Sequence, residues 1–414
     1  MRESPVHPGF RLAEVRYDIR GPLAQRARAL EAAGHAVVKL NIGNPGRFGF
    51  RLPAHLAVAI AGHLDDGDAY GHEQGLESAR EAILARQRAQ GVDAAGIERV
   101  FVGTGVSELI DLCLRALLNQ GDEVVLPAPD YPLWSAATIL NGATPRYYTC
   151  PAARAHLPDP DEIDALCGPR TRAIVLVNPN NPTGACYPRG LLERIADIAA
   201  RRGLLLMSDE IYDDIRYDGT PFTPLASLAG ELPCVTFGGL SKVHRACGLR
   251  IGWATLSGNG ARIEAYRDAL QLLAALRLCP NVPAQWAIEP ALNGPDTISA
   301  LTAPGGRLHE SRRAVLAGVA RSRFLECVAP RGALYAFPSV RGDVLPGFDG
   351  DTFAMRLLEE EHALVMPGSG FNLQQSRHFR VTLLPEAPEI ADVFARIERV
   401  LARMAVAEPA TRVA

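Results

Sequence analysis

The chain has 414 residues, and 43 basic against 46 acidic residues leave a net charge of −3. The hydrophobic content of 48% and the charged content of 21% are those of a folded globular protein, which excludes wholesale disorder. The near-neutral balance argues against a nucleic-acid partner or an anionic membrane surface, because either would need a basic excess.

Lysine is rare in this sequence. Only Lys39 and Lys242 are lysines, and the remaining 41 basic residues are arginines. Any chemistry that needs a lysine amine therefore has two candidates. Lys39 lies in the alternating run 37–40, which is typical of the exposed face of an edge strand.

The eight cysteines are widely spaced and include no C-x-x-C pair, so the sequence predicts no metal site of that kind. It predicts neither a secretory leader nor an apolar run near the ~20 residues of a membrane span. Unpaired thiols in such a chain are typical of a reducing compartment, and we expect a cytoplasmic protein without a bound metal.

Residues 98–260 alternate β-rich runs with amphipathic stretches. After Gly105, apolar residues recur at helical spacing, which predicts a helix that ends at Gly121. The alternation predicts βαβ units, so the expected fold class is α/β with a mainly parallel sheet. The expected strands are 100–102, 123–126, 173–177, 204–207, 235–237 and 251–255.

The C-terminal third has a different pattern. Residues 260–325 are expected to be mostly helical, and short strands are expected at 333–337, 363–366 and 379–382. This pattern predicts a smaller α+β domain, which the N-terminal arm joins.

Polar residues follow the predicted strands of the large sheet. Ligands of open α/β sheets bind beyond the carboxyl ends of the strands, so these residues are expected to share one edge. Each segment alone has an ordinary explanation as a tight turn, an Asx turn or a helix cap. Together they supply an anion-binding turn, an aromatic ring, an amide, a carboxylate, a phenol, an amine and a guanidinium, which is the set that pyridoxal phosphate requires. The segments are 103–108, 127–132, 178–184, 208–212, 238–242 and Arg250.

In these motifs the sequence resembles the class I and II pyridoxal-phosphate-dependent aminotransferases of fold type I, over residues 16–402. The family motifs are N-P-N-N-P-T-G at 178–184, D-E-I-Y at 209–212, S-K at 241–242 and G-L-R-I-G at 248–252. Within the family the chain is most similar to bacterial glutamate–pyruvate (alanine) aminotransferases. The closer likeness rests on I-R-G-P at 19–22, K-L-N-I-G-N-P at 39–45, F-G-F at 48–50, P-A-P-D-Y-P-L-W at 127–134, C-P-N-V-P-A-Q at 279–285 and P-G-G-R-L at 304–308.

The resemblance implies a large cofactor-binding domain over 49–295, with a mainly parallel sheet flanked by helices. It implies a smaller α+β domain built from 296–414 and from 1–48, which includes the N-terminal arm. The cofactor it implies is pyridoxal 5′-phosphate.

The resemblance also assigns roles around the cofactor ring. Lys242 would form the Schiff base and move the proton between the substrate and the cofactor. Asp209 would pair with the ring nitrogen, Tyr131 would stack on the ring, and Tyr212 and Asn181 would donate hydrogen bonds to the ring oxygen.

The phosphate is expected to bind the backbone N–H groups of Gly105 and Val106, with Ser241 and Arg250 beside it. Tyr70 resembles the tyrosine that reaches the phosphate of a neighbouring subunit. The resemblance therefore implies a homodimer.

The substrate is expected to bind through its α-carboxylate to Arg380, with Asn181 close by and Gly43 allowing a close approach of the backbone. Glutamate would need a second cation for its distal carboxylate. Arg20 in the N-terminal arm is the candidate for that role, and Arg277 is an alternative.

The expected reaction moves an amino group between L-alanine/pyruvate and glutamate/2-oxoglutarate by ping-pong kinetics. An aromatic or branched-chain aminotransferase, or a C–S β-lyase on the same fold, stays open because these enzymes share the groups named above. A transcriptional regulator and a nicotinamide oxidoreductase are disfavoured, since the sequence has neither a basic recognition helix nor a full G-x-G-x-x-G. Two departures leave the substrate preference open: His244, where close relatives have tyrosine, and the loop 71–75.

Overall fold

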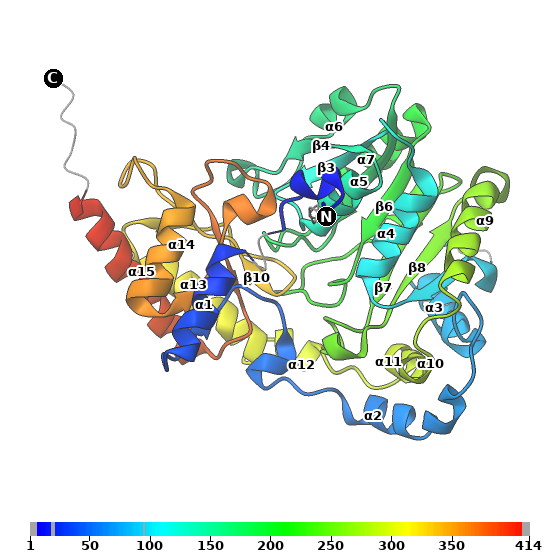
Figure 1. The fold of residues 1–414 in the computed structure, drawn as a ribbon, viewed down its shortest axis with the longest axis horizontal. Coiled ribbons are helices and arrows are strands. Elements are labelled where there is room, and N and C mark those ends of the chain that lie inside the picture. The colour runs from blue at the N-terminus through cyan, green and yellow to red at the C-terminus, as the bar shows by residue number, and fades with distance from the viewer. Residues whose placement is uncertain (1–5, 18–20, 94–95, 408–414) are drawn as a thin grey trace, which may run out of the picture.

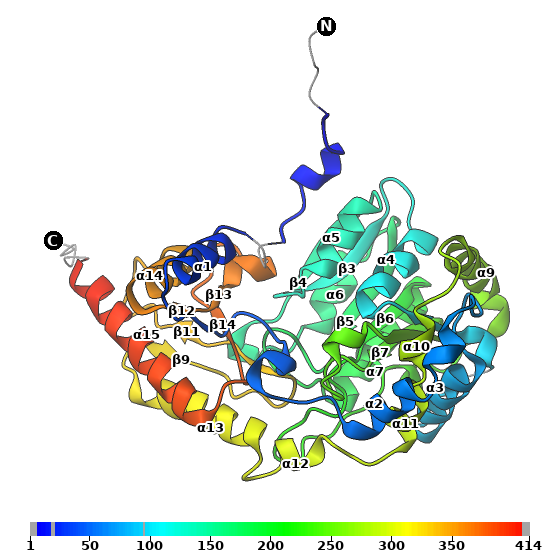
Figure 2. The same cartoon turned by 60° about the horizontal axis from the view of Figure 1, so that its bottom comes forward.

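The computed structural model describes residues 6–17, 21–93 and 96–407. They form two lobes that lie side by side (Figure 1). The larger lobe contains a seven-stranded sheet, and the smaller lobe contains short strands packed with long helices. Near the N-terminus, η1 (Phe10–Ala13) projects beyond the smaller lobe (Figure 2), and its Arg11 donates a hydrogen bond to Gln120 of the larger lobe.

The large sheet has the strand order β2-β8-β7-β6-β5-β3-β4. Of these strands only β8 runs antiparallel to its neighbours, so the expected mainly parallel sheet is confirmed. The sequence pattern missed β4, because this edge strand alternates exposed and half-buried residues instead of forming an apolar run. The strands are β2 (Val100–Gly103), β3 (Glu123–Ala128), β4 (Thr144–Thr149), β5 (Thr171–Val177), β6 (Leu205–Asp209), β7 (Cys234–Gly239) and β8 (Gly252–Ser257).

Helices cover both faces of the large sheet. One buried cluster joins the sheet to α4, α5 and α9, and a second joins it to α2, α3, α7, α10 and α11. The apolar residues of the central strands are therefore enclosed on both sides, as a mainly parallel sheet requires. The helices of this lobe are α2 (Ala54–Ala61), α3 (Glu77–Ala89), α4 (Val106–Leu117), α5 (Leu133–Leu140), α6 (Pro160–Leu166), α7 (Arg189–Arg202), α8 (Ala226–Ala229), α9 (Gly260–Leu276), α10 (Val282–Gln285) and α11 (Ile288–Asn293).

The helix predicted after Gly105 begins as expected but ends earlier. α4 stops at Leu117, because Leu118 has an extended backbone. Asp122 then closes a tight turn by accepting a hydrogen bond from the backbone N–H of Asn119, 2.8 Å away. The expected stop at Gly121 was therefore wrong by one helical turn.

The smaller lobe is built from segments at both ends of the chain. β1 (Val38–Lys39) pairs in parallel with β12 (Ala363–Leu364), and Lys39 forms a 2.8 Å hydrogen bond with Glu31. Lys39 thus lies on an exposed edge strand, as predicted. The remaining elements are α1 (Pro22–Ala32), α12 (Ser299–Thr302), α13 (Arg307–Arg321), α14 (Gly350–Glu361), α15 (Ala387–Ala407), β9 (Leu325–Glu326), β10 (Tyr335–Ala336), β11 (Ser339–Val340), β13 (Met366–Pro367) and β14 (Phe379–Thr382).

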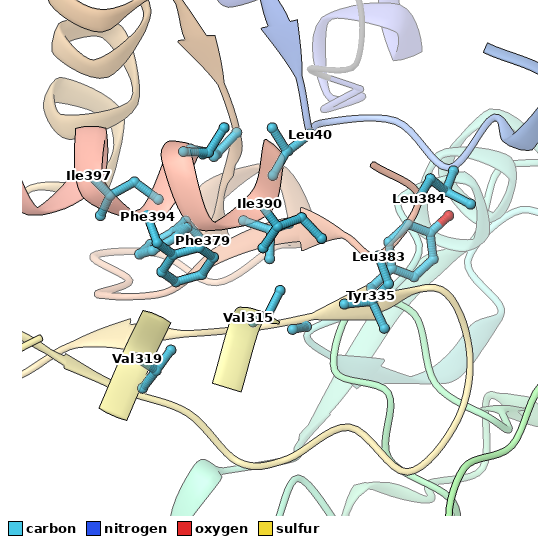
Figure 3. Close-up of a cluster of buried hydrophobic side chains, with 14 of the residues drawn as sticks. Leu40, Val315, Val319, Tyr335, Phe379, Leu383, Leu384, Ile390, Phe394 and Ile397 are labelled. Carbon is cyan, nitrogen blue, oxygen red and sulfur yellow. The ribbon is translucent and has the colours of Figure 1, made fainter. Parts of the chain in front are cut away.

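A buried apolar cluster joins these distant segments (Figure 3). It combines Leu40 near the N-terminus with Val315 of α13, Phe379 of β14 and Ile397 of α15. This packing explains why the N-terminal segment belongs with the C-terminal third. Among the described residues, no helix is long and apolar enough to cross a membrane.

Candidate active site

A cavity of about 540 Å³ lies at the carboxyl ends of the large sheet, where residues of the smaller lobe face them. Among the described site candidates, all but Gly105, Tyr70 and Arg277 line it. The lining also includes Tyr335 and Cys247, which the sequence analysis did not single out. The full lining is Tyr17, Ile42, Gly43, Asn44, Val106, Ser107, Tyr131, Val177, Asn181, Asp209, Ile211, Tyr212, Ser241, Lys242, Cys247, Arg250, Tyr335 and Arg380.

Lys242 follows β7 and enters the cavity from the large lobe. Its Nζ donates a 2.8 Å hydrogen bond to the carbonyl oxygen of Gly43 and lies 4.0 Å from the Sγ of Cys247. Ser241, next to it, is buried, and its carbonyl accepts the thiol of Cys247. The amine is thus held at the cavity wall by a neutral partner, which leaves it free to exchange that partner for a ligand.

Gly43 is required by close packing. A Cβ at this position would lie 1.9 Å from the hydroxyl oxygen of Tyr335. Any larger residue would have to displace either that phenol or the backbone that accepts from Lys242.

Asp209 ends β6 and is only 3% exposed. Its carboxylate accepts two hydrogen bonds from neutral donors: the indole N–H of Trp134 at 3.4 Å and the backbone N–H of Ile211 at 3.3 Å. Burial is the main effect on this group and raises the pKa of Asp209 to about 6. A desolvated carboxylate with neutral partners has a strong attraction for a cationic nitrogen brought beside it.

An anion-binding turn lies at the start of α4. Gly105 has φ +78°, and a Cβ there would lie 2.4 Å from an Nη of Arg250. The guanidinium of Arg250 donates to the carbonyls of Thr104 at 3.4 Å and Cys247 at 3.1 Å. Because Val106 begins α4, unpaired N–H groups and the helix dipole lie beside this cation. The turn can therefore hold a phosphate group.

Arg380 lies on β14 of the smaller lobe and is buried at 3% exposure. It donates to the Oδ1 of Asn181 at 2.8 Å and to the carbonyl of Asn41. Its guanidinium packs over the rings of Tyr335 and Phe371, 4.3 and 4.7 Å from their centroids. No carboxylate pairs with Arg380 among the described residues, and its Nε has no partner. It is therefore ready to bind a carboxylate from a substrate.

Four tyrosines complete the described walls of the cavity: Tyr17, Tyr131, Tyr212 and Tyr335. Tyr131 lies between Pro129 and Pro132, and burial raises the pKa of its phenol. Tyr212 and Tyr335 meet hydroxyl to hydroxyl at 3.2 Å. Tyr335 lies in the strand predicted at 333–337. The apolar residues around it do not indicate whether its side chain packs in the core or reaches the cavity.

Three candidates do not join this group. Tyr70 is 81% exposed and lies outside the cavity lining. Arg20 falls outside the described residues. Arg277 donates to Glu108 at 2.6 Å and to the carbonyl of Val102 at 2.7 Å, so it supports the turn before α4 and does not line the cavity.

His244 lines a separate cavity of about 370 Å³. Burial lowers the pKa of its ring to about 4, so the imidazole is neutral at physiological pH. This departure from the close relatives therefore places no charge beside Lys242.

The aminotransferase class I and II family model matches residues 35–397. The chain belongs to this family. Glutamate–pyruvate aminotransferase AlaA of Escherichia coli is 42% identical over 96% of this chain and 98% of its own length. A crystal structure of an aminotransferase from Escherichia coli has a TM-score of 0.94 at 42% identity, covering 96% of this chain and 99% of the other. Alanine aminotransferase from Pyrococcus furiosus has a TM-score of 0.91 at 34% identity, covering 96% and 100%.

Members of this family use pyridoxal 5′-phosphate to move amino groups between amino acids and keto acids. The donor set of the cavity fits this cofactor. The desolvated carboxylate of Asp209 has no cationic partner within ion-pairing distance among the described residues, and a protonated ring nitrogen would supply one. The glycine turn beside Arg250 suits a phosphate, and Lys242 supplies the amine.

Proposed function

We propose that this aminotransferase moves an amino group from L-alanine to 2-oxoglutarate, giving pyruvate and L-glutamate, and catalyses the reverse reaction. The supporting observation is the 42% identity to a glutamate–pyruvate aminotransferase over 96% of the chain. The cavity agrees with this substrate class, because Lys242 and Arg380 line one space, and no carboxylate of the described residues pairs with Arg380 there.

Within this proposal, the cofactor and three side chains have distinct chemical roles. When bound, pyridoxal 5′-phosphate supplies the ring that accepts the electron pair released at the substrate α-carbon. Asp209 holds the proton on the ring nitrogen, Lys242 carries the proton to and from the α-carbon, and Arg380 orients the substrate by its carboxylate.

The remaining contacts hold the cofactor in place. The N–H groups at Gly105 and Val106, together with Ser241 and Arg250, bind the phosphate. Tyr131 packs on the ring face.

Tyr212 and Asn181 donate to the ring oxygen. Asn181 also holds Arg380, so one amide lies beside both the cofactor and the substrate carboxylate. Gly43 leaves room for the substrate backbone.

A coupled assay tests the substrate assignment. We expect the purified holoenzyme to release pyruvate from L-alanine only when 2-oxoglutarate is present. L-Phenylalanine and L-leucine as donors should be at least about tenfold slower, since neither the methyl group of alanine nor the distal carboxylate of glutamate requires a large apolar pocket. Equal rates with the aromatic donor would favour an aromatic aminotransferase. Keto acid released from cystathionine without an amino acceptor would indicate a C–S β-lyase.

We further propose a homodimer in which Tyr70 contributes to the neighbouring site. Its 81% exposure leaves the phenol available to a second copy, and Leu272 and Leu276 of α9 are also exposed. Mixing Tyr70→Ala subunits with Lys242→Ala subunits should restore about a quarter of the wild-type activity, because half of the dimers then carry one intact site. Mixed subunits that stay inactive would contradict the shared site.

Two further assignments are part of this proposal. Residues 49–295 are taken to form one domain, and 1–48 with 296–414 the other. One apolar cluster lies wholly within 49–295, and a second forms the core of the smaller domain and also takes in Ile211, Tyr212 and Ile215 at the boundary. A reducing, cytoplasmic location is favoured by the eight cysteines, all of which have free thiols. Arg20 is kept as the candidate for the distal carboxylate of glutamate.

A further inference from the structure

Tyr335 lies at the boundary between the apolar core of the smaller lobe and the cavity. It is 2% exposed, and its ring belongs to the cluster that contains Phe379 and Leu383. Figure 3 shows it at the edge of that cluster, on the side opposite Val319 and Ile397. The same residue lines the cavity that contains Lys242. One side chain thus connects the packed core with the reacting groups.

The hydroxyl of Tyr335 contacts a group that we place beside the cofactor. It lies 3.2 Å from the hydroxyl of Tyr212, and the two rings meet edge to face at 5.9 Å. Its position is confined from the other side, because a Cβ on Gly43 would overlap it. Burial raises the pKa of Tyr212 well above its usual value, so this phenol keeps its proton.

The ring of Tyr335 contacts a group that we place beside the substrate. The guanidinium of Arg380 lies over it, 4.3 Å from the centroid, with Phe371 at 4.7 Å. Such a cation–π contact restricts the plane of the guanidinium while leaving its N–H donors free at the edge.

We propose that Tyr335 is a positioning residue that acts on both halves of the site. Its hydroxyl donates to the oxygen of Tyr212, so that the proton of Tyr212 remains available for the cofactor ring oxygen. Its ring holds Arg380 in the plane that meets the substrate carboxylate. This inference rests on the proposed function, since it takes the roles of Tyr212 and Arg380 from there.

Two variants of Tyr335 separate these actions. Tyr335→Phe keeps the ring and removes only the hydroxyl. Tyr212 then becomes a weaker donor to the ring oxygen, negative charge there is less stabilised, and the cofactor holds its proton more tightly. We expect the pH at which the visible band of the bound cofactor changes to rise by about half a unit to one unit. The KM for pyruvate should change by less than about twofold, because the contact with Arg380 remains.

Tyr335→Leu removes both contacts. We expect the same rise in the spectral titration and, in addition, an increase of about fivefold to tenfold in the KM for pyruvate. Its cofactor-free form should show a cooperative thermal transition, which establishes that the variant is folded. If this variant does not fold, the Phe variant alone still tests the hydroxyl.

Tyr217→Phe is the matched control. Tyr217 is fully buried in the same cluster, and its hydroxyl donates to the carbonyl of Ala333 at 3.0 Å, away from the cavity lining. The Tyr217→Phe substitution should lower the free energy of unfolding without changing the pH at which the visible band of the bound cofactor changes. An unchanged titration in Tyr335→Phe, or an equal shift in Tyr217→Phe, would overturn the inference. A wild-type protein that shows no cofactor band at all would instead overturn the proposed function.

Discussion

Two carboxylates in different regions of this molecule have opposite pKa shifts. Glu361, at the end of α14, accepts from Arg399 and Arg403, and these partners lower its pKa to about 2. Asp209, at the cavity, has two neutral N–H partners, and burial raises its pKa to about 6. The sign differs because Glu361 is paired with two arginines, whereas Asp209 has no cation within ion-pairing distance among the described residues, and burial outweighs the attraction of Lys242.

This difference distinguishes a structural charge from a functional one. The arginine-rich surface pairs many of its acids, so Glu361 has its partners before any ligand arrives. At the cavity, Asp209 and Arg380 are both buried, and neither forms an ion pair within the part of the chain that the structure describes. Burying the Asp209 carboxylate and the Arg380 guanidinium without ionic partners lowers the stability of the fold. A ligand that brings a cation to Asp209 and an anion to Arg380 offsets that cost.

The largest effect is expected at the amine of the cavity. Lys242→Ala removes the group that carries the proton, so we expect transaminase activity to fall by at least about a thousandfold. Borohydride reduction of the wild-type holoenzyme followed by peptide mapping should place the label on Lys242. Lys39→Ala is the matched control, because the other lysine of the chain pairs with Glu31 on the surface and should keep full activity. A labelled Lys39 would contradict the assignment.

Asp209→Asn tests the cost of the unpaired acid. Because the folded pKa of about 6 lies above the usual 3.8, the folded state binds the proton more tightly than the unfolded state. Stability is therefore lost as the pH rises from about 4 to 6, and the full cost of about 3 kcal/mol is present above that window.

We expect urea unfolding of the cofactor-free variant to show a gain of up to about 3 kcal/mol at pH 8 and little gain near pH 4. The same variant should bind pyridoxal phosphate more weakly, because it cannot hold the proton on the ring nitrogen. An equal gain at both pH values would show that ionisation of Asp209 is not its origin.

Arg277→Met tests whether the turn before α4 depends on a support outside the cavity. Arg277 and the backbone N–H of Thr104 both bind the Oε2 of Glu108, each at 2.6 Å. Loss of this support should weaken cofactor binding about tenfold, as measured by equilibrium dialysis of pyridoxal phosphate. Arg267→Met, on α9, the helix that ends at Leu276 just before Arg277, removes a surface pair with Asp268 and should leave the affinity unchanged. An equal loss in both variants would point to a general effect of α9.

The smallest effect is expected at the paired acid. Since the folded pKa of Glu361 is lowered to about 2, its contribution to stability is present above the usual pKa of 4.5 and is lost as the pH falls through about 2. Glu361→Gln should therefore lower the free energy of unfolding by about 1 kcal/mol at neutral pH, and less in high salt. If Glu361→Gln instead raised the free energy of unfolding, the two acids would not differ in the way proposed, since Asp209→Asn is also expected to raise it.

The local sequence predicted secondary structure correctly where a single segment has a clear pattern of apolar and polar residues. The apolar runs before Asn178, Asp209 and Lys242 predicted central strands, since both faces of such strands are buried. The polar residue after each run then marked the edge where ligands bind. The early end of α4 was missed because the turn at Asn119 and Asp122 competes with the helix through local hydrogen bonds.

What the sequence by itself determined was the set of reacting groups and their shared edge, because the order of strands and polar residues along the chain carries that information. Only the tertiary structure decided which of these groups lack a partner. Arg380 and Tyr335 come from a lobe distant in sequence from Tyr212 and Lys242, and Arg277 pairs with Glu108 outside the cavity lining. Whether a charged group finds an ionic partner depends on distances between segments far apart in sequence. This pairing is what gives Asp209 and Glu361 opposite pKa shifts.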